Sequence, residues 1–134
     1  MIKIQSRFEV ELSEFLSSYH FYVEMIEEGI YVVKRGDELP VFLSAKGDSL
    51  YFEVDLGNFS DIKSDELMFK LLDYNTEILP VSFGINNSKP DNPRLVLVES
   101  RSSVNLQQED FLSVFDALEL ATDKAEELLA EYLK

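Results

Sequence analysis

The sequence of 134 residues contains no cysteine, no tryptophan and only one histidine. Without cysteine, disulfide bonds, thiolate catalysis and cysteine-ligated zinc are excluded. The single histidine, His20, cannot by itself form a histidine-rich metal site, and no Ser-His-Asp set can be assembled around it. We interpret it as a structural or surface residue. The five glycines never occur in the Gly-x-Gly-x-x-Gly or Gly-Lys-Ser patterns that bind phosphates. The common catalytic and nucleotide-binding motifs are therefore missing.

Long hydrophobic runs are also missing. No stretch approaches the roughly 18 consecutive apolar residues that a membrane-spanning helix needs. The first ten residues lack the apolar segment of a secretory signal. We therefore expect a cytoplasmic protein that does not insert directly into a membrane.

Positive charge is scarce, with 12 Lys and Arg against 26 Asp and Glu and a formal net charge of -14. This charge repels a phosphate backbone, so we expect no nucleic-acid partner. It suits a basic or partly unfolded protein partner, and the alternative is that it serves solubility alone. Three cations, Lys34, Arg35 and Lys46, form a small basic island. The island predicts either a contact for an acidic partner or protection of a sheet edge.

The numerous carboxylates show no catalytic or metal-binding spacing. Glu24, Glu27 and Glu28 lie near one expected turn, and Asp48 and Asp55 also lie near a turn, without the spacing of an EF-hand. A solvated surface explains them, so we expect no enzyme, no catalytic residue, no metal site and no cofactor. The alternative is an enzyme with a cryptic pair of buried acids, which requires a deep pocket.

What is present predicts one domain over residues 1–134. Hydrophobic residues make up 46% of the chain, with ten Phe and six Tyr to fill a core. Helical spacing predicts a helix over residues 8–19 and a second one that begins after Ser64 and ends before Pro80. Short runs rich in β-branched and aromatic residues predict strands. These runs cover residues 21–26, 30–34, 41–45, 50–56, 80–85 and 94–101.

The expected fold is therefore α+β. Three or four strands follow the first helix, then come a helix, two strands and a long C-terminal helix. Helices that return to one side of an antiparallel sheet of five to six strands give this class.

The C-terminal helix is the most distinctive predicted element. Asn105 and Gln108 suggest a capping box at its start. A helix from there to the C-terminus would be roughly 40 Å long, against a radius of gyration of about 14 Å for a chain of this size. We therefore predict that its apolar stripe overhangs the domain and is covered by a second copy, which makes the protein a homodimer. The residues assigned to this partner or dimer interface are Phe111, Phe115, Leu118 and Leu128. Simple core packing of the same residues is the alternative.

Several local strings resemble a known family. Residues 37–44 read Asp-Glu-Leu-Pro-Val-Phe-Leu-Ser, residues 47–50 read Gly-Asp-Ser-Leu, and residues 79–85 read Leu-Pro-Val-Ser-Phe-Gly-Ile. Over residues 39–133 the sequence resembles the YjfI-like family of small bacterial proteins, which has no assigned activity. The order of elements also resembles that of class I type III secretion chaperones, which are small, acidic, cytosolic homodimers.

The resemblances imply a secretion-chaperone-like fold and work beside phage-shock-type coiled-coil proteins that protect membranes. The leading hypothesis is a non-enzymatic protein-binding module that acts as a homodimeric chaperone or adaptor on another protein. That protein would be a coiled-coil membrane-stress protein. The alternative is a type III secretion chaperone whose partner is a secreted effector. The two hypotheses differ in the expected neighbouring gene.

Overall fold

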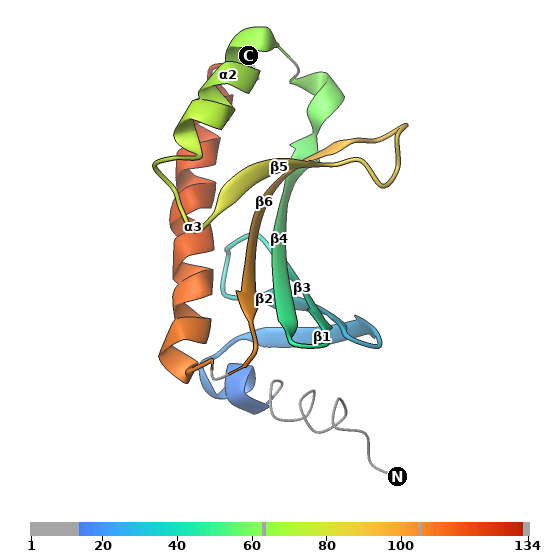
Figure 1. Ribbon diagram of the computed structural model, residues 1–134, viewed down its shortest axis with the longest axis vertical. Coiled ribbons are helices and arrows are strands. Elements are labelled where there is room, and N and C mark those ends of the chain that lie inside the picture. The colour runs from blue at the N-terminus through green and yellow to red at the C-terminus, as the bar shows by residue number, and fades with distance from the viewer. Residues whose placement is uncertain (1–13, 63, 105, 133–134) are drawn as a thin grey trace.

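The computed structural model describes residues 14–62, 64–104 and 106–132 of the chain. Helical residues 14–18 come first, followed by four strands, a 3₁₀ helix, an α-helix, two strands and a final long helix (Figure 1). They are β1 (Tyr22–Glu27), β2 (Ile30–Lys34), β3 (Val41–Lys46), β4 (Ser49–Asn58), the 3₁₀ helix η1 (Phe59–Asp61), α2 (Asp65–Tyr74), β5 (Ser82–Asn86), β6 (Arg94–Ser102) and α3 (Gln108–Ala130).

The strands form a six-stranded sheet in the order β1-β2-β3-β4-β6-β5, and every neighbouring pair is antiparallel. β1 and β5 are the two edge strands. The sheet is strongly twisted, so that β1 and β2 run across the direction of β4 and β6 (Figure 1). The α+β class and the predicted order of elements are confirmed.

Alternation along β4 separates the two faces of the sheet. Leu50, Phe52 and Val54 are almost fully buried, whereas Tyr51 between them is 40% exposed. Because successive side chains of a strand point to opposite faces, one face of the sheet lies against the helices and the other faces solvent. We call the second one the open face.

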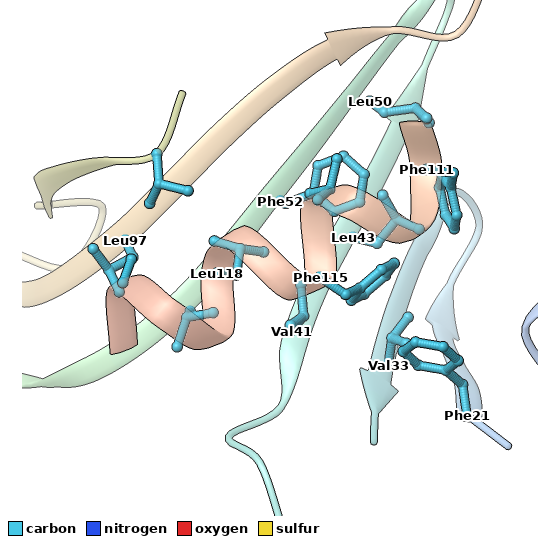
Figure 2. Packing of buried hydrophobic residues seen from close by; sticks show 14 of the residues in the cluster. Phe21, Val33, Val41, Leu43, Leu50, Phe52, Leu97, Phe111, Phe115 and Leu118 are labelled. Atoms are coloured by element: carbon cyan, nitrogen blue, oxygen red, sulfur yellow. The ribbon is translucent and has the colours of Figure 1, made fainter. Parts of the chain in front are cut away.

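The main core lies between the sheet and α3. Figure 2 shows Phe111, Phe115 and Leu118 of α3 among buried side chains of the strands. The rings of Phe111 and Phe115 both contact that of Phe52, with centroids 5.8 Å apart in each case. Such tilted and edge-on ring pairs stabilise a core beyond the area that they bury.

A second buried cluster joins α2 to the C-terminal half of α3. It contains Ile62, Leu67, Leu71, Leu95 and Leu129. The predicted N-cap of α2 is confirmed, because the Leu67 backbone N–H donates to Ser64 Oγ at 2.9 Å. The two clusters together cover the apolar stripe of α3 from Phe111 to Leu129, so the predicted overhang is wrong.

Two further predictions about helix ends have different outcomes. The capping box is wrong, because α3 begins at Gln108 and its N-cap position is Gln107; Asn105 lies outside the described residues. The first helix agrees with the sequence over residues 14–18, and residues 8–13 of that prediction lie outside the described part of the chain.

His20 ends the first helix. Its φ of 68° lies in the left-handed region, and the Phe21 and His20 backbone N–H groups donate to Leu16 O and Ser17 O. These two bonds form a Schellman motif, in which the left-handed position is usually glycine. The His20 side chain is exposed, so the role of this residue is to end the helix through its backbone conformation. Within the described ranges, no helix is long and apolar enough to cross a membrane.

Candidate protein-binding surfaces

The four residues that the sequence assigned to a dimer interface are not on the surface together. Phe111, Phe115 and Leu118 are at most 5% exposed and pack in the chain's own core. Only Leu128 is partly exposed, and it packs against the second cluster. The positions agree with the core-packing alternative, because the sheet and α2 already cover the stripe. Of the four residues, only Leu128 is accessible to a second copy in this arrangement.

Apolar side chains are exposed on α2 and on the outer side of α3. Phe69 and Leu72 of α2 are 73% and 70% exposed, Leu79 is 71% exposed, and Leu120 of α3 is 68% exposed. Leu79 and Leu120 line one hollow of about 300 Å³ together with Ile78 and Ala117. We call Leu79, Leu120, Ile78 and Ala117 the α3 apolar hollow. Exposed apolar side chains that cluster in this way are typical of interaction sites.

The open face of the sheet is the second surface. One cross-strand row runs over all six strands and contains Glu24, Val32, Phe42, Glu53, Val98 and Ser82. Glu53 Oε1 accepts a hydrogen bond from Tyr51 Oη at 2.8 Å, and Glu53 Oε2 accepts one from Asn86 Nδ2 at 3.1 Å. Burial, followed by this hydrogen bond to Glu53, raises the pKa of Tyr51 well above its usual value. The network links β4 to the edge strand β5.

The third surface is a groove of about 460 Å³ between α3 and the connection from β2 to β3. Its floor is apolar and includes Val33, Val41 and Leu118, while Leu39 on the connection is 39% exposed. Its rim is acidic and includes Asp37, Glu38, Glu119, Asp123 and Glu126. We call this the acidic groove.

Arg35 fixes one wall of the acidic groove. Its guanidinium donates to Glu38 within the same connection and to Asp116 and Glu119 on α3, at 2.6 to 3.0 Å. It also lies over the Phe21 ring, 5.4 Å from the centroid. The hydrogen bond to Glu38, with that to Asp116, raises the pKa of Arg35 despite the opposing effect of burial. The fork geometry of arginine lets one side chain tie the connection to α3.

The basic island predicted from the sequence has a role defined by the structure only at Arg35. Lys34 ends β2 and Lys46 ends β3, and both strands are interior strands of the sheet. Protection of a sheet edge is wrong for this reason. Arg35 already forms ion pairs with three carboxylates of its own chain, so it is not free to bind an acidic partner.

Metal-binding geometry does not emerge from the described residues. Among them, no group of three His, Cys, Asp or Glu side chains is arranged to hold a metal ion. His20 lies at the exposed end of the first helix. The acids of the groove rim are exposed or half-buried rather than deeply buried.

Solved structures with this fold include chains from type III secretion complexes. A chain of the heterodimeric ExoU–SpcU complex from the type III secretion system of Pseudomonas aeruginosa matches with a TM-score of 0.68 and 15% identity, over 87% of this chain and 96% of that one. A chain of the HopA1–SchA chaperone–effector complex matches with a TM-score of 0.61 and 13% identity, over 94% and 92%. The secretion-chaperone-like fold is thereby confirmed.

The same fold also occurs outside such complexes. An uncharacterized protein from Methanothermobacter thermautotrophicus matches with a TM-score of 0.71 and 12% identity, over 94% of this chain and 99% of that one. No family model matches the sequence and no curated protein is similar to it, so the comparisons give the YjfI-like resemblance no support.

Proposed function

We propose that this chain is a non-enzymatic protein-binding module of the secretion-chaperone type, which acts as a homodimer on a segment of another protein. The observation that carries the proposal is the fold shared with chains of the ExoU–SpcU and HopA1–SchA complexes. The described surface supports it, because apolar side chains are exposed on α2, α3 and the open face. The coiled-coil adaptor expected from the YjfI-like resemblance has no comparable match.

The test is to produce the tagged chain together with each protein encoded beside its own gene and to isolate the complex. The partner segment would lie in an extended or helical form across the open face or in a groove beside a helix. Hydrogen exchange should therefore show one short protected segment within an otherwise unprotected region of the partner. Protection of a long, already helical coiled coil would favour the membrane-stress adaptor. Absence of any complex after gentle crosslinking would contradict both.

The homodimer belongs to the same proposal, with its interface moved to the α3 apolar hollow. A second copy that covers Leu79 and Leu120 would remove two of the most exposed aliphatic side chains from water. We expect sedimentation velocity at micromolar concentration to give a dimer for the natural chain and a monomer for Leu79→Asp/Leu120→Asp. Val104→Asp, at another exposed aliphatic residue, is the control and should leave the dimer intact. A natural chain that sediments as a monomer would overturn this part.

A further inference from the structure

The side of α3 that borders the acidic groove carries more negative charge than the stability of the chain explains. Asp116, Glu119, Asp123 and Glu126 recur along α3 at spacings of three and four, so they lie on one side of the helix. Like charges at these spacings destabilise a helix by a few tenths of a kcal/mol per pair, approximately. Arg35 compensates the first two acids, Asp116 and Glu119.

The other two acids have no such compensation. Over the described ranges, no cation lies within ion-pair distance of Asp123 or Glu126. Both line the groove beside Thr122, whose hydroxyl is turned away because Thr122 Oγ1 donates to Leu118 O of the same helix at 2.7 Å. The Thr122 hydroxyl therefore does not donate to Asp123 or Glu126, and both carboxylates can accept from a ligand.

The floor supplies the apolar half of the site. Leu39 is 39% exposed and lines the groove together with Val41 and Leu118, which are 7% and 1% exposed. Arg35 holds the connection that carries Leu39 against α3, so the groove exists before a ligand arrives. A preformed site loses less conformational entropy on binding than one that has to be ordered.

We propose that the acidic groove binds a segment of the partner protein in which an apolar side chain is flanked by Lys or Arg. The apolar side chain packs against Leu39 and the groove floor, and the flanking cations pair with Asp123 and Glu126. This inference rests on the proposed protein-binding function and specifies which segment of a partner is recognised. Complementary charge at the rim then selects the segment, while the floor excludes purely polar ones.

The first experiment uses two labelled synthetic peptides, one of Lys and Leu and one of Lys and Ser, at physiological ionic strength. Fluorescence anisotropy should show tighter binding of the Lys/Leu peptide. Asp123→Asn/Glu126→Gln should weaken its binding by roughly three- to tenfold, because exposed ion pairs contribute modestly. Leu39→Ser should also weaken it. The matched control, Glu28→Gln/Asp48→Asn, removes the same charge from exposed turn positions outside the groove and the open-face row and should leave binding unchanged.

Three results would overturn the proposal. They are equal weakening by the groove and control variants, equal affinity for the two peptides, and no binding of the Lys/Leu peptide. A second measurement separates this failure from failure of the proposed function. If the natural chain and Asp123→Asn/Glu126→Gln retain the co-produced partner equally well, the groove is wrong and the protein-binding function stands. If the natural chain retains no partner, the function itself is wrong.

Discussion

Arg101 donates from Nε to Oε2 of Glu99 at 2.7 Å, on the side of β6 that also carries Leu97. The Glu99 side chain is only 1% exposed, whereas that of Arg101 is 32% exposed. The other carboxylate oxygen, Oε1, has no hydrogen-bond partner within the described part of the chain. Arg101 is therefore the contact that makes a carboxylate tolerable at a buried position of the sheet.

Arg101→Ala should destabilise the fold markedly. It leaves the buried Glu99 carboxylate without its cation, and losing one partner of a buried pair costs about 3 kcal/mol or more. Partial exposure of Arg101 reduces this cost, so we expect the free energy of unfolding in urea to fall by about 2 kcal/mol. Glu99→Leu/Arg101→Leu removes both charges and should recover part of the loss. A stability for Arg101→Ala within 0.5 kcal/mol of the natural chain, approximately, would contradict the assignment.

His20→Gly should stabilise the chain. Histidine in the left-handed region carries a steric cost of roughly 1–2 kcal/mol that glycine avoids, and the larger unfolded-state entropy of glycine offsets about half of it. We therefore expect a net gain of about 0.5 kcal/mol in urea unfolding. Ser18→Gly, on the preceding helical turn, is the control and should cost up to about 1 kcal/mol. A loss of stability in His20→Gly would show that its side chain contributes more than its backbone.

The strands were predictable because their signal is local. Alternation in β4 and the Gly-containing turns on either side of β3 depend on neighbouring residues alone, so the sequence places these strands within one or two residues. The N-cap at Ser64 has the same local character. The start of α3 was misplaced because Gln107, a poor capping residue, occupies the N-cap position, and nothing in its side chain marks it.

The binding surfaces were not predictable because they depend on which elements meet. Helical spacing shows that Phe115 and Leu118 share a stripe, but not whether the sheet or a second copy covers it. The acidic groove combines Leu39 with Asp123, which are far apart in the sequence. The regular acidic spacing along α3 was visible in the sequence and could have marked one rim. The pairing of Arg35 with Asp116 could not be predicted from the sequence, because the two residues meet only in the folded chain.

Leu118→Ala and Leu120→Ala separate the two sides of α3. Leu118 is 1% exposed and Leu120 is 68% exposed, although the two lie on the same turn of the helix. Leu118→Ala removes buried apolar contacts and should cost about 2–5 kcal/mol. Leu120→Ala should change stability by less than about 0.5 kcal/mol. Thermal unfolding of dilute samples checks both. Similar losses for the two variants would mean that Leu120 is covered in the folded protein.

Tyr51 should make stability fall at alkaline pH. Its pKa is raised in the fold, first by burial and then by the hydrogen bond that it donates to Glu53, so the folded state keeps its proton longer than the unfolded chain does. The contribution to stability is complete below the ordinary tyrosine pKa of about 10, and it is lost as the pH rises from there towards the folded value. The stability difference between the natural chain and Tyr51→Phe should accordingly shrink above about pH 10.

Absorbance of tyrosinate at alkaline pH measures the Tyr51 pKa directly. Glu53→Gln removes the charged acceptor but not the burial, so it should lower the Tyr51 pKa only in part. Ionisation of Tyr51 ahead of the other five tyrosines would contradict the arrangement on the open face.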